Sequence, residues 1–533
     1  MVFGNPDLRA AQLGLAVAKV VDLAQLIALS AYLYAGEGVA AVAAYGIVRA
    51  LAPAVGVPMV TATTARLGAG RLLVLLGGTA AVAAVVVTTA AVLDGPLLAV
   101  LAPAGVLHVL LGAYRPVVSA LLPALVRSPE ELMACTAACG LLDGVTFLAG
   151  PLVAGLLLAA AGPGVVLYAT VVLLAGAMLT CARLAEPPPA SSPVRRADRA
   201  AAARAFFGTP QVRMITVLVS AQTFVRGALS VLVVVLAIEV LGLDDSGVGM
   251  LFAAIGVGAL LGLPLAYALT GRQLFRALGL GLVLWGLPLA AAAVVPHVAV
   301  VLLLFAVVGV GNDLVDLGAF SALPRVVPER VLPTVFGLLE AAIQLGAALG
   351  AAAAGVLLTV VDVDVALYVV GSVLPVAAVL AGRRLRSFDD RMGRRDADVD
   401  LLRRQPMFAV LPVHLLDTLA SRLRTGRYAP GQPILLEGGP GDRYVLLVHG
   451  EVRIERTGVA VDLRRAGDGF GEIALVRDVP RTATARAATA VTVQSLDREA
   501  FLAALGHDPL AWRAAADVID ARMPSIAPSP RTV

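Results

Sequence analysis

The sequence is poor in charged residues and almost free of lysine. Charged residues make up 15% of the 533 positions, against roughly 25% in soluble domains, and 59% of the residues are hydrophobic. Lys19 is the only lysine among the 41 basic residues. Because the arginines are spread over many short loops, the net charge of +4 does not indicate nucleic-acid binding. The composition is typical of a membrane protein and excludes a wholly soluble chain.

Cysteine and several catalytic motifs are also scarce or missing. Cys135, Cys139 and Cys181 lie in apolar segments, without C-x-x-C spacing or partner histidines, so we expect small core residues and no metal site. Neither a Walker loop nor a nucleophile elbow is present, which disfavours an enzyme. The chain also lacks a TVGYG-type filter and a helix of repeated arginines, which disfavours an ion channel. The N-terminus has no signal-peptide cleavage pattern, so we expect the first helix to be retained.

The long apolar runs are confined to residues 1–386, and 387–533 is an ordinary charged segment. About 20 apolar residues are needed for a helix to cross a bilayer. Twelve segments satisfy this length: 11–35, 39–62, 72–93, 97–124, 132–160, 164–185, 212–241, 247–270, 275–295, 298–322, 333–360 and 364–382.

Basic residues alternate between the connections of these segments. The connections at 36–38, 94–95, 162–164, 242–247, 296–297 and 362–364 contain no lysine or arginine. The others contain Arg66, Arg71, Arg127, Arg195, Arg196, Arg199, Arg204, Arg272, Arg276, Arg325, Arg330, Arg383, Arg384 and Arg386. Since basic loops stay in the cytoplasm, we expect a multi-pass protein of the inner cell membrane with both termini and the charged tail in the cytoplasm.

The apolar part contains an internal repeat. FGNPDLR at 3–9 recurs as FGTPQVR at 207–213, and FLAGPLVAGLLL at 147–158 aligns with AALGAAAAGVLL at 347–358. LLPALVRSPE at 121–130 has a counterpart in ALPRVVPER at 322–330. Matches in one order at nearly one offset predict two six-helix halves of the same orientation. The predicted parts are the half 1–185, a linker 186–206, the half 207–386, a linker 387–400 and a domain 401–525.

Two parallel six-helix halves resemble the major facilitator superfamily, and local motifs strengthen the resemblance. The sequence G-P-x-x-A-G at 150–155 resembles the fifth-helix signature of that family. ARLGAGR at 65–71 resembles its loop motif, with Ala65 where the family has Asp. The resemblance implies a secondary transporter in the lipid bilayer with a small-molecule substrate.

Charges inside the predicted spans need a reason, because each costs ~2.5–3.5 kcal/mol at the bilayer centre. The candidates for substrate or proton coupling are Lys19, Asp22, Arg115, Asp143, Arg226, Asp313, Asp316 and Glu340, with Arg49 as a further one. The repeat offset makes Asp22 equivalent to Arg226, and Arg115 equivalent to Asp316. This favours charge pairs that bridge the halves, with Asp22 as the first choice for a proton site.

A structural interpretation stays open for the same residues. Lys19 and Asp22 are three apart on one helix and can neutralise each other, and Arg115 can serve helix packing alone. We expect His108 and His297 to lie towards the outer side of the membrane, at its interface.

The tail has a different pattern. An apolar helical face at 408–419 precedes short β-prone runs separated by the turn signals PGQP, GGPGD, HGE and RTG, and two helices follow. This order resembles the cyclic nucleotide-binding domain, and so does the cassette FGEIALVRDVPRTAT at 470–484. We therefore expect a mainly α membrane protein, a 12-helix bundle of two six-helix parallel repeats, with a small α+β cytoplasmic domain that contains a β-barrel.

The resemblance assigns the cassette residues. The resemblance implies that Glu472, with Gly471, contacts a ribose 2′-hydroxyl. It also implies that Arg481 contacts the cyclic phosphate, whose oxygens suit a guanidinium. It implies as well that the backbone N–H groups of Ile473 and Ala474 donate hydrogen bonds to the phosphate. Thr482 and Ala483 follow beside the phosphate or base, and Trp512 or Arg513 is a candidate to cover the base.

The resulting prediction is a transporter that is regulated by a cyclic nucleotide, with cAMP favoured over cGMP. One alternative is an exporter of the nucleotide itself, and a nucleotide-gated channel is a weaker one. The substrate, the coupling ion and the oligomeric state stay open.

Overall fold

The computed structural model describes residues 6–61, 67, 69–125, 129–182, 196–244, 246–269, 273–295, 297–327, 331–411 and 413–522. The chain divides into two compact units, Met1–Phe388 and Asp389–Val533. Most of the predicted linker 186–206 lies outside the described residues, and only its end is seen, in α7 (Arg196–Gly208).

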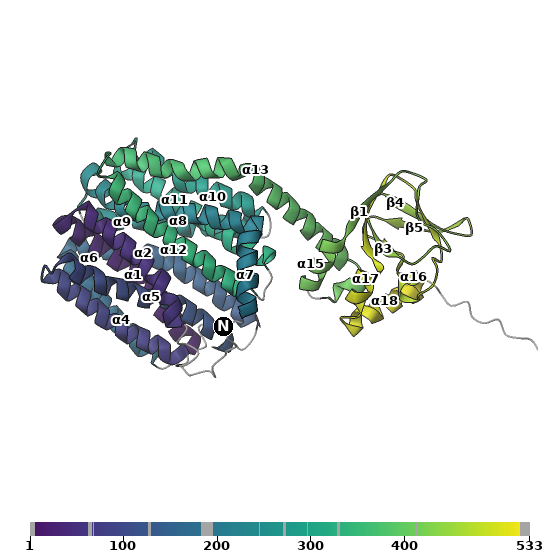
Figure 1. The fold of residues 1–533 in the computed structure, drawn as a ribbon, viewed down its shortest axis with the longest axis horizontal. Helices are drawn as coiled ribbons and strands as arrows, with labels where there is room; N and C mark the ends of the chain where they lie inside the picture. The colour runs from purple at the N-terminus through teal and green to yellow at the C-terminus, as the bar shows by residue number, and fades with distance from the viewer. Residues whose placement is uncertain are drawn as a thin grey trace, which may run out of the picture. The chain divides into compact units, whose positions relative to one another are not determined.

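The first unit is a bundle of long helices (Figure 1). Besides α7 it comprises α1 (Pro6–Glu37), α2 (Val39–Thr61), α4 (Ala69–Val92), α5 (Leu97–Leu125), α6 (Pro129–Cys181), α8 (Pro210–Val235), the π-helix η2 (Leu236–Val240), α9 (Ser246–Leu269), α10 (Leu274–Ala292), α11 (Val298–Val326), α12 (Leu332–Leu357) and the start of α13 (Val363–Arg403). Within the described residues, eleven helices are long and apolar enough to cross a membrane. A helix suits such a sequence because it satisfies every backbone hydrogen bond internally.

Helix α6 covers two of the twelve predicted spans. It contains one non-helical residue, Gly162, with φ 77° and ψ 174°. Glycine tolerates this positive φ because it has no Cβ. The interruption falls between the predicted spans 132–160 and 164–185.

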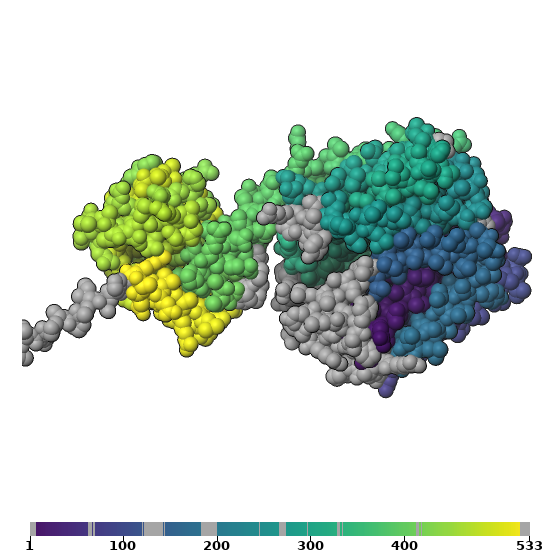
Figure 2. Space-filling model, turned by 180° about the vertical axis from the view of Figure 1, so that it is seen from behind, coloured from purple at the N-terminus to yellow at the C-terminus, as the bar shows by residue number. Residues whose placement is uncertain are grey.

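The N-terminal and C-terminal helices form two groups within this unit (Figure 2). Between the groups, α2 packs on α12 and α6 packs on α9. Small residues make these contacts very close. A Cβ added at Gly249 would lie 2.6 Å from the Cα of Gly155, and one added at Gly46 would lie 2.8 Å from the Cβ of Ala351. Such residues let helix backbones approach in a membrane.

The second unit contains two four-stranded antiparallel sheets, in the orders β1-β8-β3-β6 and β2-β7-β4-β5. Its strands are β1 (Arg424–Tyr428), β2 (Pro433–Leu435), β3 (Arg443–His449), β4 (Glu451–Arg456), β5 (Val459–Arg465), β6 (Gly469–Phe470), β7 (Thr484–Ala487) and β8 (Val491–Asp497). Its helices are the end of α13, α14 (Pro406–Ala409), α15 (Val413–Arg422), α16 (Glu472–Val476), α17 (Arg498–Leu505) and α18 (Pro509–Arg522). The predicted linker 387–400 is helical and belongs to α13.

Strand β3 connects the two hydrophobic cores of this unit. Its side chains alternate between the two faces of the sheet, as strand geometry requires. Val445 and Leu447 belong to the core between the sheets, and Tyr444 and Leu446 belong to the core beneath the helices. Burial raises the pKa of the Tyr444 phenol above its usual range, and its hydroxyl donates a hydrogen bond of 3.0 Å to Gln405 Oε1. The two cores hold the cassette in place.

Candidate functional site

The cassette predicted from the sequence folds as a turn, a short helix and a loop. Strand β6 ends at Phe470, α16 begins at Glu472, and the chain returns to the sheet as β7 at Thr484. Gly471 joins β6 to α16 with φ 96° and ψ 3°. Ile473 and Ala474 lie in the first turn of α16, where backbone N–H groups have no acceptor within the helix. This geometry agrees with the predicted cradle, whose assignment to a ligand stays a prediction.

Glu472 is a buried carboxylate with one oxygen in use. The residue is only 1% exposed. Its Oε1 accepts a hydrogen bond of 2.7 Å from Nη1 of Arg522, whereas its Oε2 is buried and has no hydrogen-bond partner. An unsatisfied buried acceptor costs about 1–3 kcal/mol. Glu472 Oε2 is therefore ready to accept a hydrogen bond from a hydroxyl group.

Arg481 contacts Gly471, the residue before Glu472, and is held by several hydrogen bonds. It is 4% exposed. Its guanidinium donates four hydrogen bonds of 2.7–3.1 Å, to the carbonyl oxygens of Pro440, Gly471 and Arg443 and to Oδ1 of Asp442. A guanidinium has five N–H groups, so one N–H on Nη1 stays available for an anionic oxygen.

Gly471 is required for this arrangement. A Cβ at position 471 would lie 2.8 Å from Nη1 of Arg481. The positive φ adds a cost for any residue with a Cβ. Gly471 therefore leaves room for the guanidinium as well as forming the turn. Thr482 and Ala483, which follow Arg481, are both half-buried.

The terminal helix α18 also contacts the cassette, through residues that the sequence reasoning did not identify. Arg522 bonds to Glu472 and to the carbonyl oxygen of Gly469, at 2.7 and 2.9 Å. Arg477, directly after α16, donates to Oδ1 of Asp520 at 2.9 Å. The predicted cover, Trp512, is 42% exposed. The contact with Glu472 comes instead from Arg522, ten residues further along the helix.

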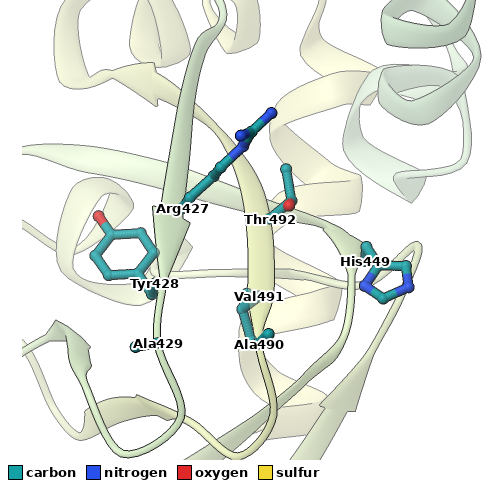
Figure 3. Close-up of a pocket in the computed structure, with 7 residues that line it drawn as sticks. All are labelled: Arg427, Tyr428, Ala429, His449, Ala490, Val491 and Thr492. Carbon is teal, nitrogen blue, oxygen red and sulfur yellow. The ribbon is translucent and has the colours of Figure 1, made fainter.

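A shallow hollow of about 330 Å³ lies elsewhere on the sheets, beside Arg427, Tyr428, Ala429, His449 and Thr492. The side chains of Arg427, Tyr428 and His449 point in different directions (Figure 3). Since they do not converge on one point, this hollow offers no ligand geometry comparable to that of Glu472 and Arg481.

In the helical unit, Asp22 has other partners than the predicted one. Arg49 on α2 forms an ion pair with its Oδ2, and Nδ1 of His108 on α5 bonds to its Oδ1 at 2.8 Å. Nε2 of His108 lies 3.0 Å from the hydroxyl of Tyr45. The expectation that His108 lies at the interface was wrong. It is 2% exposed, because Asp22 and Tyr45 satisfy both ring nitrogens and permit its burial.

Arg226 on α8 lies in a field of mixed charges. Asp316, Glu340 and Asp22 attract it, and Arg49 repels it. Arg226, Asp316 and Glu340 are exposed to solvent, and so is Arg115. Lys19 is half-buried, and the side chain of Asp143 lies outside the described residues. The structure thus brings charges from both halves near Arg226, while the roles of these residues in transport stay predictions.

Asp313 on α11 differs from these residues. Its Oδ2 is buried and has no hydrogen-bond partner. The other two carboxylates have partners. Oδ2 of Asp316 accepts a hydrogen bond of 3.2 Å from Nδ2 of Asn312, and Glu340 accepts one of 3.2 Å from Gln344. Among the predicted carboxylates of the helical unit with a described side chain, Asp313 is the one with a buried, unpaired oxygen.

Comparisons with known proteins match both units. The family model described as "Major Facilitator Superfamily" matches residues 215–413, and that described as "Cyclic nucleotide-binding domain" matches residues 425–508. The predicted fusion of two such domains is thereby confirmed. Together with the eleven apolar helices, the first match identifies a multi-pass membrane protein.

Similar individual proteins are regulatory subunits of protein kinases. The cAMP-dependent protein kinase regulatory subunit of Pyricularia oryzae is 34% identical over 134 residues, which is 25% of this chain and 34% of that protein. The corresponding protein of Colletotrichum orbiculare is 37% identical over 120 residues, 22% and 31% of the two chains. The regulatory domain of Toxoplasma gondii PKA with cAMP is 24% identical, with a TM-score of 0.23, and the match covers 26% of this chain and 52% of that one. The chain thus spans about a third of the length of these curated relatives.

Proposed function

Since the chain joins a Major Facilitator Superfamily domain to a cyclic nucleotide-binding domain, we propose that it is a secondary transporter regulated by a cyclic nucleotide, with cAMP as the favoured ligand. The nucleotide binds at the cassette of Gly471, Glu472 and Arg481. The membrane unit carries a small molecule and is not an enzyme.

The observation that carries the sensor proposal is the complementary pair of free groups at the cassette. Glu472 Oε2 is a buried acceptor without a partner, which suits the ribose 2′-hydroxyl. Arg481 retains one N–H donor, which suits an oxygen of the cyclic phosphate. Hydrogen bonds to charged groups contribute about 1.5–3 kcal/mol each. The backbone N–H groups of Ile473 and Ala474, in the first turn of α16, are further candidate donors for the phosphate.

Regulation by the nucleotide would act through Glu472, which contacts both the ligand and helix α18. Arg522 on α18 holds Oε1 of Glu472, while a bound ribose takes Oε2. The ligand therefore binds one arrangement of α18 better than another, and only such a difference can shift an equilibrium. Helix α13 offers a route to the membrane unit, because Val363–Phe388 belongs to the first unit and Asp389–Arg403 to the second.

Twelve spans in two parallel repeats best account for the membrane unit. With the offset of 204 between FGNPDLR and FGTPQVR, α2 corresponds to α9, and at nearly the same offset the first part of α6 corresponds to α12. If the two halves are exchanged, the contact of α2 with α12 is replaced by the contact of α9 with α6. Both contacts are present. A two-fold relation between the halves predicts this exchange. The distribution of arginine then supports a cytoplasmic sensor in the inner cell membrane.

Nucleotide binding is tested by calorimetric titration of the full-length protein in nanodiscs with cAMP and with cGMP. Arg481→Ala should weaken binding by about 10- to 150-fold, the loss of one charged hydrogen bond. Arg486→Ala is the matched control, since Arg486 lies on the adjacent strand β7 and pairs with Glu455 at 3.3 Å. Absence of binding of both nucleotides to the wild type would refute the sensor.

Regulation needs its own measurement. Amide hydrogen exchange in α8–α12 should change when the nucleotide is added to the wild type and stay constant in Arg481→Ala. Equal exchange with and without nucleotide in the wild type would leave a sensor that does not act on the transporter.

A further inference from the structure

The buried oxygen of Asp313 bears on whether its carboxyl group is ionised or neutral. Asp313 is the sixteenth residue of α11, which spans Val298–Val326, so it lies roughly 20 Å from either end at 1.5 Å per residue. An ionised carboxylate in the middle of such a helix is costly unless it is paired. The structure gives Oδ2 of Asp313 no hydrogen-bond partner.

The neighbouring helix seals this oxygen. A Cβ added at Gly262 of α9 would lie 2.8 Å from Oδ2 of Asp313 and 3.1 Å from the Cα of Val310. One turn away, a Cβ at Gly258 would lie 1.7 Å from the carbonyl oxygen of Ala306. The backbones of α9 and α11 are therefore in close contact at Gly262 and again one turn away at Gly258. Oδ2 is shielded from water at this contact, while Asp313 as a whole is half-buried.

No described opposite charge neutralises Asp313. Helix α9 carries no acid or base among its described side chains, Ser246 to Leu265. Arg276 lies near the start of α10, and Arg226 of α8 is attracted by Asp316 and Glu340. The charge that acts on Asp313 is the carboxylate of Asp316, one turn further along α11, and it is of the same sign.

Asp22 is in the opposite situation. Both of its oxygens are occupied, by Arg49 and by Nδ1 of His108. A carboxylate that is paired with a guanidinium stays ionised, so Asp22 is suited to hold α1, α2 and α5 together and poorly suited to exchange a proton during each cycle.

We propose that Asp313, and not Asp22, is the proton-binding residue of this transporter. With α9 and α11 closed, the side chain is the neutral carboxylic acid. When the two helices separate, water reaches Oδ2, the O–H bond breaks and the proton passes to water, which leaves the ionised carboxylate of Asp313. Reprotonation from water on the other side of the membrane permits closure. This rests on the proposed transport function and makes the coupling ion a proton.

Infrared spectroscopy tests the assignment without knowledge of the cargo or the nucleotide. The full-length protein in nanodiscs should show the carbonyl band of a protonated carboxyl group at neutral pH, and this band should vanish at alkaline pH. Asp313→Asn should lose the band, and Asp22→Asn should retain it. A band that persists in Asp313→Asn, or that disappears in Asp22→Asn, would overturn the proposal.

A second variant keeps the test decisive if Asp313→Asn does not fold. Gly262→Ala places a methyl group against Oδ2 and should push the carboxyl group towards water, which weakens the band at neutral pH. Gly337→Ala is the matched control, because no atom lies within 4 Å of a Cβ at that position of α12. An undiminished band in Gly262→Ala counts against the proposal. Since no nucleotide is present, failure here is distinct from failure of the sensor.

Discussion

Nη1 of Arg522 donates a hydrogen bond of 2.7 Å to the buried Oε1 of Glu472, fifty residues earlier in the chain. Glu472 is 1% exposed on its side chain, and Arg522 is 23% exposed. The bond ties α18 to the residue that we expect to contact the ribose. The stability of the unit and its affinity for the ligand should therefore both depend on the carboxylate of Glu472.

We expect this pair to be energetically coupled. Glu472→Gln and Arg522→Gln should each lower the free energy of unfolding of the unit 389–533 by about 1–3 kcal/mol, because each leaves a charged partner without its counterpart. The double variant should lose less than the sum of the two. Chemical denaturation of this unit, which has its own hydrophobic cores, measures all four proteins. Additive losses would contradict the coupling.

The second link between α16 and α18 should matter far less. Arg477 and Asp520 also form an ion pair, but their side chains are 44% and 73% exposed. Exposed pairs contribute about 0–1 kcal/mol. Asp520→Asn should therefore leave both the stability and the nucleotide affinity nearly unchanged. A loss as large as that of Arg522→Gln would show that α18 is held in another way.

Gly471→Ala should weaken nucleotide binding at least about tenfold, the equivalent of 1.4 kcal/mol. The added methyl group would lie 2.8 Å from Nη1 of Arg481 and displace the guanidinium. Gly458→Ala is the control, since Gly458 has a φ of 83° in the turn between β4 and β5 and has no atom within 4 Å of its Cβ position. Titration should show reduced affinity for the first variant and wild-type affinity for the second. Equal affinities of the two variants would show that Gly471 does not contribute to the nucleotide site.

The cassette was predictable because its parts are close in the sequence. Gly471 and Arg481 are ten residues apart and are joined by a local turn and a short helix, while Pro440, Asp442 and Arg443 supply further hydrogen-bond partners for the guanidinium. The contacts of Arg522 and of His108 were not predicted, for the opposite reason. Each is joined to its partner across at least fifty residues, and such contacts depend on the packing of whole helices, for which the sequence carries no local pattern.

The membrane unit illustrates the same limit. Apolar length alone located the helices, because a bilayer requires about 20 residues per span. The repeat related Asp22 to Arg226, yet the nearer Arg49 on α2 became its ion-pair partner. Equivalence by repeat shows which residues face the same region, and the rotation of each helix then decides which side chains touch.

Saturating nucleotide should stabilise the unit 389–533 against unfolding. At a ligand concentration of 100 times the Kd, the free energy of unfolding rises by about 2.7 kcal/mol when only the folded state binds. Thermal unfolding of the unit 389–533 with cAMP should show this increase in the wild type and in Arg486→Ala, and no increase in Arg481→Ala. The same shift in Arg481→Ala would place the ligand elsewhere on the unit.

Removing one charge of the half-buried Asp22–Arg49 pair should destabilise the bundle more than removing both. Asp22→Asn leaves the guanidinium of Arg49 without its counter-ion, and Arg49→Gln does the reverse, so each should cost about 1–3 kcal/mol because both side chains are only a third or less exposed. In the double variant no charge is left unpaired, so part of this loss is regained.

The apparent unfolding temperature of the full-length protein in detergent measures this effect. Glu239→Gln is the control, since Glu239 accepts an exposed hydrogen bond from Tyr34 and its loss should shift the midpoint little. A double variant that is less stable than either single variant would mean that Asp22 and Arg49 each hold their helix through separate contacts. The partial recovery that we expect would instead identify the pair as one structural unit, with the proton chemistry left to Asp313.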